Sequence, residues 1–331
     1  MSGFNLKEGQ YNNRPLSDDE MWSAFSYVFS SNSKNSTSYK FGFLKSILDN
    51  LYNVDSELRL TFDQLFTKFA EVYWNLILKY NLRQSPKTSD NKMTYIEQIL
   101  YSAASIYKIA DGVPFEKLPA DIIIKIAHDV KMKCKINVVG ALFDDTKRSF
   151  YSFSRREEWI KINPLMYEFV CKHKVVIEKL NYYEWAKFLE KVNDDSVVIH
   201  LLDKLDESGK RHNLSIYRQI LYDEFESNLC FYCGKPITDK RVEVDHFIPW
   251  SFVKDDNLWN LVLSCPDCNR SKRDRLPDKY YLDKLVMRND IITREFNRLD
   301  MNNYKDDNLR LIYYYARVNG YDKIWKPKKV V

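Results

Sequence analysis

Apolar residues recur every three or four positions along most of the first two hundred residues, which is the spacing of amphipathic helices. Two of these stretches begin with helix-start signatures: Ser17 precedes three acidic residues, and Thr61 with Gln64 forms a capping-box pattern. The predicted helical segments include residues 17–29, 38–51, 61–80, 93–109 and 120–134. This pattern predicts an all-α bundle in the first part of the chain.

The pattern changes between residues 136 and 163, where short stretches rich in β-branched and aromatic residues read INVVGALF, RSFYSF and WIKIN. With turn signals between them, they predict β-structure and a short hairpin near 140–163. Two interpretations of this hairpin remain open. As the wing of a winged-helix arrangement it would bring basic residues to phosphates, whereas an ordinary hairpin would leave them solvated. The residues concerned are Lys147, Arg148, Arg155 and Arg156.

Polar and turn-forming residues divide the chain into segments. The stretch DESGKRHN, residues 206–213, is the predicted domain linker. Residues 1–16 are expected to be disordered, and 17–205 to form a mostly helical domain for recognition or regulation. A second domain is predicted over 214–290, followed by C-terminal helices and a basic tail over 291–331. Its entering helix is expected at 215–225.

Composition and charge narrow the class of protein. The 331 residues carry 51 basic and 46 acidic side chains, and the net charge of +5 permits nucleic-acid binding without requiring it. No apolar run approaches the ~20 residues of a membrane span. The polar start lacks the features of a signal peptide, and the cysteines are not arranged as a disulfide framework. We therefore expect a cytoplasmic protein that does not bind membranes.

Four of the six cysteines form two C-x-x-C pairs, Cys230/Cys233 and Cys265/Cys268. Two such pairs are typical of a structural zinc site, in which four thiolates leave no open coordination position. The zinc would join the two ends of the segment between the pairs, so any chemistry belongs to that segment and not to the zinc. A zinc ribbon that only binds nucleic acid or protein remains an alternative. Cys134 and Cys171 are expected to be buried thiols.

The segment VDHFIPWSFVKDDNLWNLVLSCPDCNRSK resembles the HNH (His-Asn-His) endonuclease family, in its zinc-ribbon branch. It is also similar to the HNH domain of the RNA-guided CRISPR nucleases, which share the run DH-x-x-P-x-S-F-x-K-D-D. The resemblance covers roughly residues 218–283 and implies a ββα-metal fold around one divalent ion. The fold class expected is therefore mainly α with a small α+β unit: a helical N-terminal domain and a C-terminal HNH nuclease domain held together by structural zinc.

The resemblance also implies roles for individual residues. His246 would be the general base, Asp245 and Asn269 would bind the catalytic metal, and Asn260 would tie the loop near His246. Many relatives carry histidine where this chain has Asn269, and an all-oxygen site favours Mg²⁺ or Mn²⁺ over Zn²⁺. The basic run after Asn269 would contact phosphates or, because it contains Asp274, form only a solvated helix face. The candidate nucleic-acid contacts are Arg270, Lys272, Arg273 and Arg275.

These implications predict a metal-dependent endonuclease that hydrolyses DNA, with double-stranded DNA as the first expectation. By analogy with the family and the architecture, we expect a role in bacterial restriction or anti-phage defence, with a protein partner or a homodimer as possible assemblies. Three alternatives remain open: a nuclease that cuts RNA, a homing nuclease of the same chemistry, and a non-catalytic zinc-ribbon nucleic-acid-binding protein. The last alternative predicts that His246→Ala leaves function intact.

Overall fold

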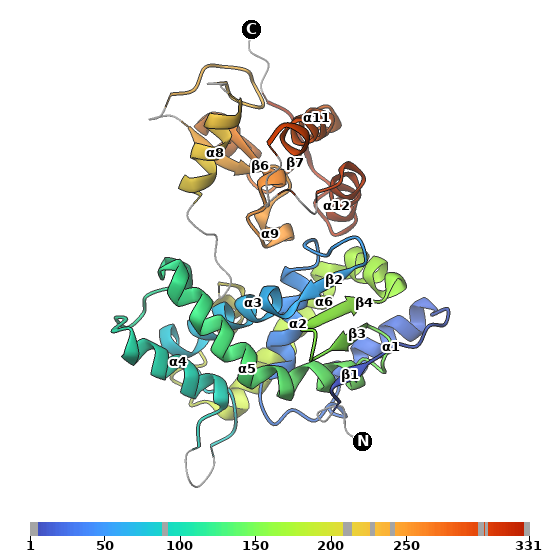
Figure 1. Ribbon diagram of the computed structural model, residues 1–331, viewed down its shortest axis with the longest axis vertical. Coiled ribbons are helices and arrows are strands. Elements are labelled where there is room, and N and C mark those ends of the chain that lie inside the picture. The colour runs from blue at the N-terminus through green and yellow to red at the C-terminus, as the bar shows by residue number, and fades with distance from the viewer. Residues whose placement is uncertain are drawn as a thin grey trace. The chain divides into compact units, whose positions relative to one another are not determined.

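The computed structural model of the chain divides it into two compact units, Met1–Lys210 and Arg211–Val331 (Figure 1). The structure describes residues 6–87, 92–207, 214–225, 229–238, 242–296, 301 and 304–327. The boundary between the units falls in the stretch 206–213, of which residues 208–213 lie outside the described residues. Within the part of the chain described, every helix is too short or too polar to cross a membrane.

Unit 1 is mainly helical. Its helices are α1 (Asp18–Val28), α2 (Tyr39–Asp49), α3 (Phe62–Trp74), α4 (Tyr95–Ile106), α5 (Ala120–Asp145), α6 (Pro164–Val192) and α7 (Leu201–Asp206). Ser17, Thr61 and Thr94 each accept a hydrogen bond from the backbone of the residue three positions later, and the side chain of that residue bonds back. These reciprocal bonds satisfy backbone donors at the first turn, so the predicted helix starts at Ser17 and Thr61 are confirmed.

Helix α2 lies at the centre of unit 1, in contact with α3, α5 and α6. All of its residues are buried, including Lys45 and Asp49, which form an ion pair of 2.8 Å one helical turn apart. Gly42 permits this packing, because a Cβ atom there would lie 2.3 Å from the ring of Tyr73. The sequence 38–51 therefore forms a core helix surrounded on all sides.

A small antiparallel sheet completes unit 1, with the strand order β1–β3–β4–β2. Its strands are β1 (Glu8–Gly9), β2 (Arg59–Thr61), β3 (Tyr151–Ser154) and β4 (Trp159–Ile162). The hairpin β3–β4 confirms the hairpin predicted within 140–163. Both of its strands have a second neighbour in the sheet, so this hairpin is an internal part of the sheet and not a free wing.

Two expectations for unit 1 differ from the structure. Part of the N-terminal stretch expected to be disordered is ordered: Glu8–Gly9 pairs with β3, and the Tyr11 amide donates to Ser152 Oγ. The glycine allows this pairing, because a Cβ on Gly9 would lie 2.7 Å from the Phe153 ring. The stretch INVVGALF, predicted to be β-like, is helical and belongs to α5, where tertiary packing overrides its β propensity.

Unit 2 contains a two-stranded sheet followed directly by a helix. Strand β5 (Glu243–His246) pairs antiparallel with β6 (Leu261–Ser264), and α10 (Pro266–Lys272) begins immediately after the first cysteine of the second pair. This is the ββα order that the resemblance implies. The connection between the strands contains α9 (Trp250–Val253) and a 3₁₀ turn (Leu258–Asn260).

Other helices of unit 2 support this arrangement. The entering helix α8 (Ser215–Phe225) matches the prediction, and it contacts both β5 and β6. Helix α11 (Lys279–Phe296) runs across the expected boundary at 290, so the C-terminal helices belong to the same compact unit as the strands. Helix α12 (Asp306–Val318) follows, and β8 (Ile324–Trp325) returns to pair parallel with β7 (Leu276–Pro277).

Candidate functional site

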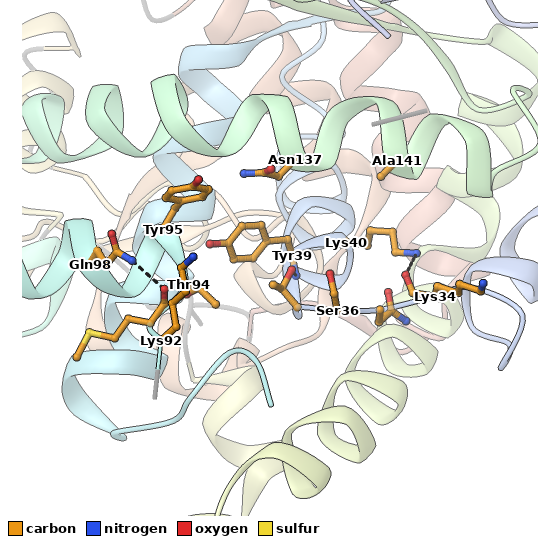
Figure 2. A pocket seen from close by; sticks show the side chains of 13 residues that line it. Lys34, Ser36, Tyr39, Lys40, Lys92, Thr94, Tyr95, Gln98, Asn137 and Ala141 are labelled. Carbon is orange, nitrogen blue, oxygen red and sulfur yellow. Dashed lines mark hydrogen bonds between the residues drawn. The ribbon is translucent and has the colours of Figure 1, made fainter. Parts of the chain in front are cut away.

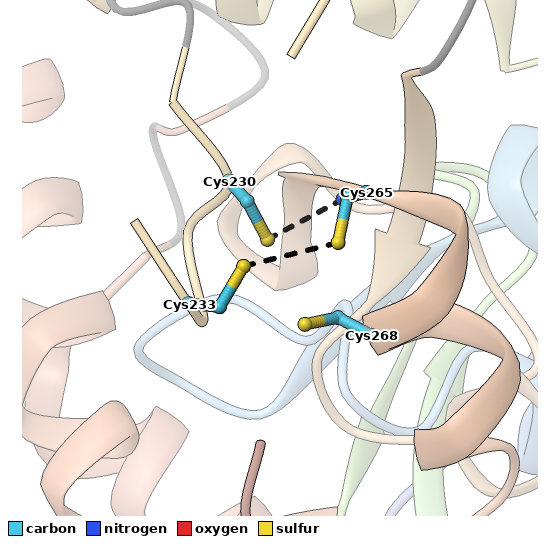
Figure 3. Close-up of side chains that lie close together, drawn as sticks. All are labelled: Cys230, Cys233, Cys265 and Cys268. Atoms are coloured by element: carbon cyan, nitrogen blue, oxygen red, sulfur yellow. Dashed lines mark hydrogen bonds between the residues drawn. The ribbon is translucent and has the colours of Figure 1, made fainter. Parts of the chain in front are cut away.

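The four cysteines of the two C-x-x-C pairs converge in unit 2 (Figure 3). Cys230 and Cys233 come from a turn held by the backbone bond from Gly234 to Cys230. Cys265 is the N-cap of α10, and Cys268 lies in its first turn. All four sulfur atoms lie within 4.8 Å of one another, and those of Cys233 and Cys265 are 3.8 Å apart.

This cluster fits a tetrahedral zinc ion. Four sulfurs each ~2.3 Å from a central zinc are separated by ~3.8 Å, which is the spacing of the Cys233 and Cys265 sulfurs. Burial and the neighbouring thiols raise the pKa of the Cys268 thiol, and a bound cation would reverse this by stabilising the thiolate. The Cys265 amide donates to Cys230 Sγ over 3.3 Å, a contact that also favours a charged sulfur.

His246 is the last residue of β5 and is buried. Its Nε2 lies 2.7 Å from Oδ1 of Asp256, which is also buried and follows α9. A carboxylate at this distance favours the tautomer with hydrogen on Nε2, and the lone pair then lies on Nδ1. The pair thus resembles the arrangement in which a carboxylate orients a histidine base and stabilises its protonated form.

Asn260 is fully buried and clamps the chain just beyond His246. Its Oδ1 accepts from the Ile248 amide at 2.8 Å, and its Nδ2 donates to the Ile248 carbonyl at 2.9 Å. The Asn260 carbonyl also accepts from the Phe247 amide. These three bonds fix the backbone at the exit of β5, so the direction in which the chain leaves His246 is set by Asn260.

Asp245 precedes His246 on β5. Successive side chains of a strand point to opposite faces, so the partners of Asp245 differ from those of His246. Lys272 Nζ lies 3.2 and 3.1 Å from the two carboxylate oxygens of Asp245, and the Tyr232 hydroxyl donates to Oδ2 at 2.6 Å. Lys272 also donates to the His246 carbonyl at 2.7 Å. Burial, followed by the charge of Asp245, raises the pKa of Tyr232, so its hydroxyl remains a donor.

Lys272 therefore differs from its expected place among the phosphate contacts. It is 1% exposed and lies on the inner side of α10, one turn after the buried Cys268. The difference follows from helical periodicity: residues 268 and 272 share one face of the helix, and the thiolate cluster fixes that face inward. In this structure Lys272 neutralises Asp245 instead of facing solvent.

Asn269 lies on α10, and its Nδ2 donates to Oε2 of Glu243 at 2.7 Å. Glu243 is two residues before Asp245 on β5 and therefore on the same side of the strand. The oxygen groups of Asp245, Asn269 and Glu243 thus come from facing elements, and oxygen donors suit Mg²⁺ or Mn²⁺. The donor chemistry fits such a cation, although Asp245 is already paired with Lys272.

The remaining basic residues of the run line a groove of about 790 Å³ at the end of α10. Arg270 and Arg273 are exposed there beside Asp274, and residues 320–323, including Asp322 and Lys323, form another wall. Arg275 also lines the groove, but its guanidinium donates to the Lys272 and Ser271 carbonyls. The Tyr321 hydroxyl donates to Ser251 Oγ at 3.0 Å, which fastens this wall to α9.

Four residues of this region were not assigned roles from the sequence: Tyr232, Glu243, Asp256 and Lys323. Asp256 belongs to the K-D-D run on which the resemblance rests, and an acidic residue near a histidine could have indicated a pair. Glu243 could have been found from the period of two along β5. Lys323 carries no local signal, because only the return of the chain after α12 brings it to the groove.

Comparison with known families agrees with this geometry. Residues 230–278 match the sequence model of a family described as HNH endonuclease, and the match includes both cysteine pairs, β5, β6 and α10. Neither the curated proteins nor the solved structures contain a match to the chain. HNH domains are metal-binding nuclease domains, and the four-cysteine cluster is compatible with their zinc-ribbon form. Residues 230–278 of unit 2 thus carry the sequence pattern of the HNH endonuclease family, in the same segment that forms the ββα unit.

Proposed function

We propose that the protein is a metal-dependent endonuclease that hydrolyses phosphodiester bonds of DNA. The observation that carries this proposal is the buried His246–Asp256 pair at 2.7 Å, at the end of β5 within the segment that matches the HNH family. A zinc ribbon that served only for binding would not require a buried, oriented imidazole beside its strand hairpin. The choice of DNA as the substrate is supported by the groove beside α10, which is lined by basic residues.

His246 acts as the general base. Asp256 holds the imidazole with hydrogen on Nε2, and Nδ1 takes a proton from the water that attacks phosphorus. The imidazolium formed in this step is stabilised by the Asp256 carboxylate. The new bond joins the water oxygen to phosphorus, the bond from phosphorus to the leaving sugar oxygen breaks, and that oxygen keeps the electron pair and takes a proton from solvent water. Asn260 contributes by fixing the backbone that follows the base.

Asp245 and Asn269 would hold a Mg²⁺ or Mn²⁺ ion, with Glu243 as an additional oxygen donor beside Asn269. Such an ion supplies charge neutralisation at the phosphate when it is bound. Lys272 competes for Asp245, because its ammonium group already balances that carboxylate. Occupation of the cation site therefore requires Lys272 to weaken or leave its ion pair with Asp245.

Cys230, Cys233, Cys265 and Cys268 hold a structural Zn²⁺ ion in this proposal. The site joins the turn before β5 to the start of α10, and so it fixes the two elements that carry Asp245 and Asn269. A unit of this size has a small core, and metal binding adds to its folding free energy. Because the ligands must remain reduced, we propose a reducing compartment such as the cytoplasm.

Arg270 and Arg273, with Lys323 on another wall of the groove, are the proposed phosphate contacts. Contacts of this kind position the duplex and give affinity, but they do not read its sequence. Arg275 shapes the groove through its bonds to the end of α10. We propose double-stranded DNA as the substrate and restriction or defence against phage as the role, with recognition assigned to unit 1 or to a protein partner.

The proposal is tested by incubating the full chain with labelled double-stranded DNA, single-stranded DNA and RNA, each with Mg²⁺, Mn²⁺ or EDTA. We expect cation-dependent internal cleavage of DNA. Arg270→Ala with Arg273→Ala should weaken DNA binding and reduce the dependence of binding on salt by about two counterions. Cleavage of RNA alone would show that RNA, and not DNA, is the substrate. Failure to cleave any of the three substrates would contradict the proposed activity.

A further inference from the structure

A pocket of about 410 Å³ lies within unit 1, far in sequence from the HNH segment. Its walls come from the loop before α2, the start of α4 and the C-terminal half of α5 (Figure 2). Tyr39 and Tyr95 face this space from α2 and α4, and Asn137 and Ala141 lie across it on α5. This size lies within the range of pockets that hold small organic ligands.

The charge of the lining is one-sided. Three of the lining residues are lysines, Lys34, Lys40 and Lys92, and none is acidic. Lys40 is buried and has its own partners: its Nζ donates to Ser33 Oγ, to the Lys34 carbonyl and to Asp145. Lys34 is exposed and makes no ion pair within the described part of the chain. The pocket therefore offers positive charge at its rim and favours an anion.

The uncharged part of the lining is aromatic and apolar. Tyr95 and Met93 are 55% and 47% exposed, although they are large apolar side chains at the start of a helix. Exposed aromatic faces of this kind bind planar rings by stacking. Tyr39 continues this surface inward, and its hydroxyl accepts from the Ile96 amide at 3.0 Å. The same pocket thus combines an aromatic surface with cationic groups.

Among the buried side-chain polar atoms of the lining, Asn35 Oδ1 lacks a hydrogen-bond partner. Asn35 Oδ1 is buried without a hydrogen bond, while Asn35 Nδ2 donates to the Ser33 carbonyl at 3.2 Å. A buried acceptor without a donor is unfavourable, and a donor that reached Asn35 Oδ1 from the adjoining pocket would remove this cost. Gln98 and Asn137 also line the pocket; their side-chain nitrogens donate to the Met93 and Lys133 carbonyls, and their side-chain oxygens can accept from the edge of a heterocycle.

From these features we infer that the pocket binds a nucleotide, with the heterocycle against Tyr95 and its phosphate near Lys34. Stacking on Tyr95 would use the exposed aromatic face, and a phosphate would match a lysine rim free of acidic residues. A purely apolar ligand would leave the lysines unused, and an inorganic anion would leave the aromatic surface unused. This site is independent of the nuclease function proposed for unit 2.

Titration calorimetry of the full chain tests this inference. The probes are the four ribonucleoside 5′-monophosphates, the corresponding nucleosides and inorganic phosphate. At least one monophosphate should bind, and its nucleoside and inorganic phosphate should each bind about tenfold or more weakly. Absence of heat with every monophosphate up to about 1 mM would overturn the inference. Since no cleavage is measured, this result is independent of whether the protein is a nuclease.

Two variants locate the binding. Lys34→Glu should weaken monophosphate binding about tenfold or more and leave nucleoside binding unchanged. Tyr95→Ala should weaken both the monophosphate and the nucleoside. The matched control is Lys125→Gln, which changes an exposed lysine of α5 that is paired with Asp121 outside the pocket. Monophosphate binding that persists in Lys34→Glu and Tyr95→Ala would place the nucleotide elsewhere and overturn the assignment.

Discussion

At the scale of single residues, the candidate active site is built from paired polar groups, most of which are buried. His246 is paired with Asp256, Asp245 with Lys272, and Asn269 with Glu243. Buried polar groups of this kind are tolerated only when each has a partner. The His246–Asp256 pair and the Asp245–Lys272 pair therefore each make a prediction for the removal of one member.

Asp256→Asn should preserve the fold and lower the cleavage rate about 100-fold or more, because an amide cannot stabilise the imidazolium of His246 as a carboxylate does. The effect should fall on kcat, with KM for DNA little changed. Asp255→Asn is the matched control, because it changes the adjacent and more exposed carboxylate. Equal rates in the Asp256→Asn variant and the wild type would remove Asp256 from the mechanism.

Lys272→Met should destabilise unit 2 by about 3–5 kcal/mol, because it leaves the Asp245 carboxylate buried without its cation. Adding Asp245→Asn should restore much of that loss, since the uncompensated charge is then absent. Urea unfolding followed by amide exchange in β5 and β6 measures both effects. Arg270→Met is the control, and as an exposed substitution it should change stability by at most about 0.5 kcal/mol. Equal stability of Lys272→Met and Arg270→Met would contradict the ion-pair account.

At the scale of elements, each unit contains a segment that its neighbours hold in place. In unit 2, α11 holds the turn before β6 through Asn289, whose amide donates to the Trp259 carbonyl at 2.8 Å. In unit 1, α2 is buried along its whole length, and Gly42 lies against the ring of Tyr73. Close packing makes such segments sensitive to small increases in volume.

Gly42→Ala should destabilise unit 1 by about 1–3 kcal/mol, although alanine is the better helix former. The added Cβ would lie 2.3 Å from Cε2 of Tyr73, which is far inside van der Waals contact. In a Tyr73→Leu background the same substitution should cost much less, because the opposing ring atoms are absent. Thermal unfolding of the four proteins measures this coupling, and equal effects in both backgrounds would disprove the steric account.

Features set by local sequence could be predicted, whereas features set by tertiary packing could not. Capping boxes at Ser17 and Thr61 are local signals, so those helix starts could be predicted. The stretch INVVGALF carries a local β preference that packing within α5 overrides, and β1 forms only because β3 offers an edge. The cysteine cluster was predictable from spacing alone, whereas the burial of Lys272 depends on the orientation of a short helix.

At the scale of the whole molecule, the six cysteines occupy two environments: two are buried in the core of unit 1, and four form the cluster of unit 2. Burial raises the pKa of Cys134 to about 12 and also raises that of Cys171, so neither forms a reactive thiolate near neutral pH. Both lie in unit 1, whereas the other four form the cluster of unit 2. Accessibility of the thiols can therefore be followed separately for each unit.

Alkylation with iodoacetamide at pH 8 followed by mass spectrometry should label none of the cysteines in the zinc-loaded native protein. A strong chelator should expose Cys230, Cys233, Cys265 and Cys268 alone, because zinc release loosens unit 2 and leaves unit 1 folded. Denaturant should then expose Cys134 and Cys171 as well. Rapid labelling of the four cluster cysteines in the presence of zinc would contradict the structural metal site.

The central claim is that unit 2 is a nuclease whose base is His246. The most direct test is cleavage of supercoiled plasmid by the full chain with Mg²⁺, Mn²⁺ or EDTA, beside His246→Ala and the control His128→Ala, which alters an exposed histidine of α5. Circular dichroism and zinc content establish that the variants are folded. We predict nicking or linearisation that requires the divalent cation, persists in His128→Ala and is lost in His246→Ala. Cleavage that persists undiminished in a folded His246→Ala protein would contradict the account.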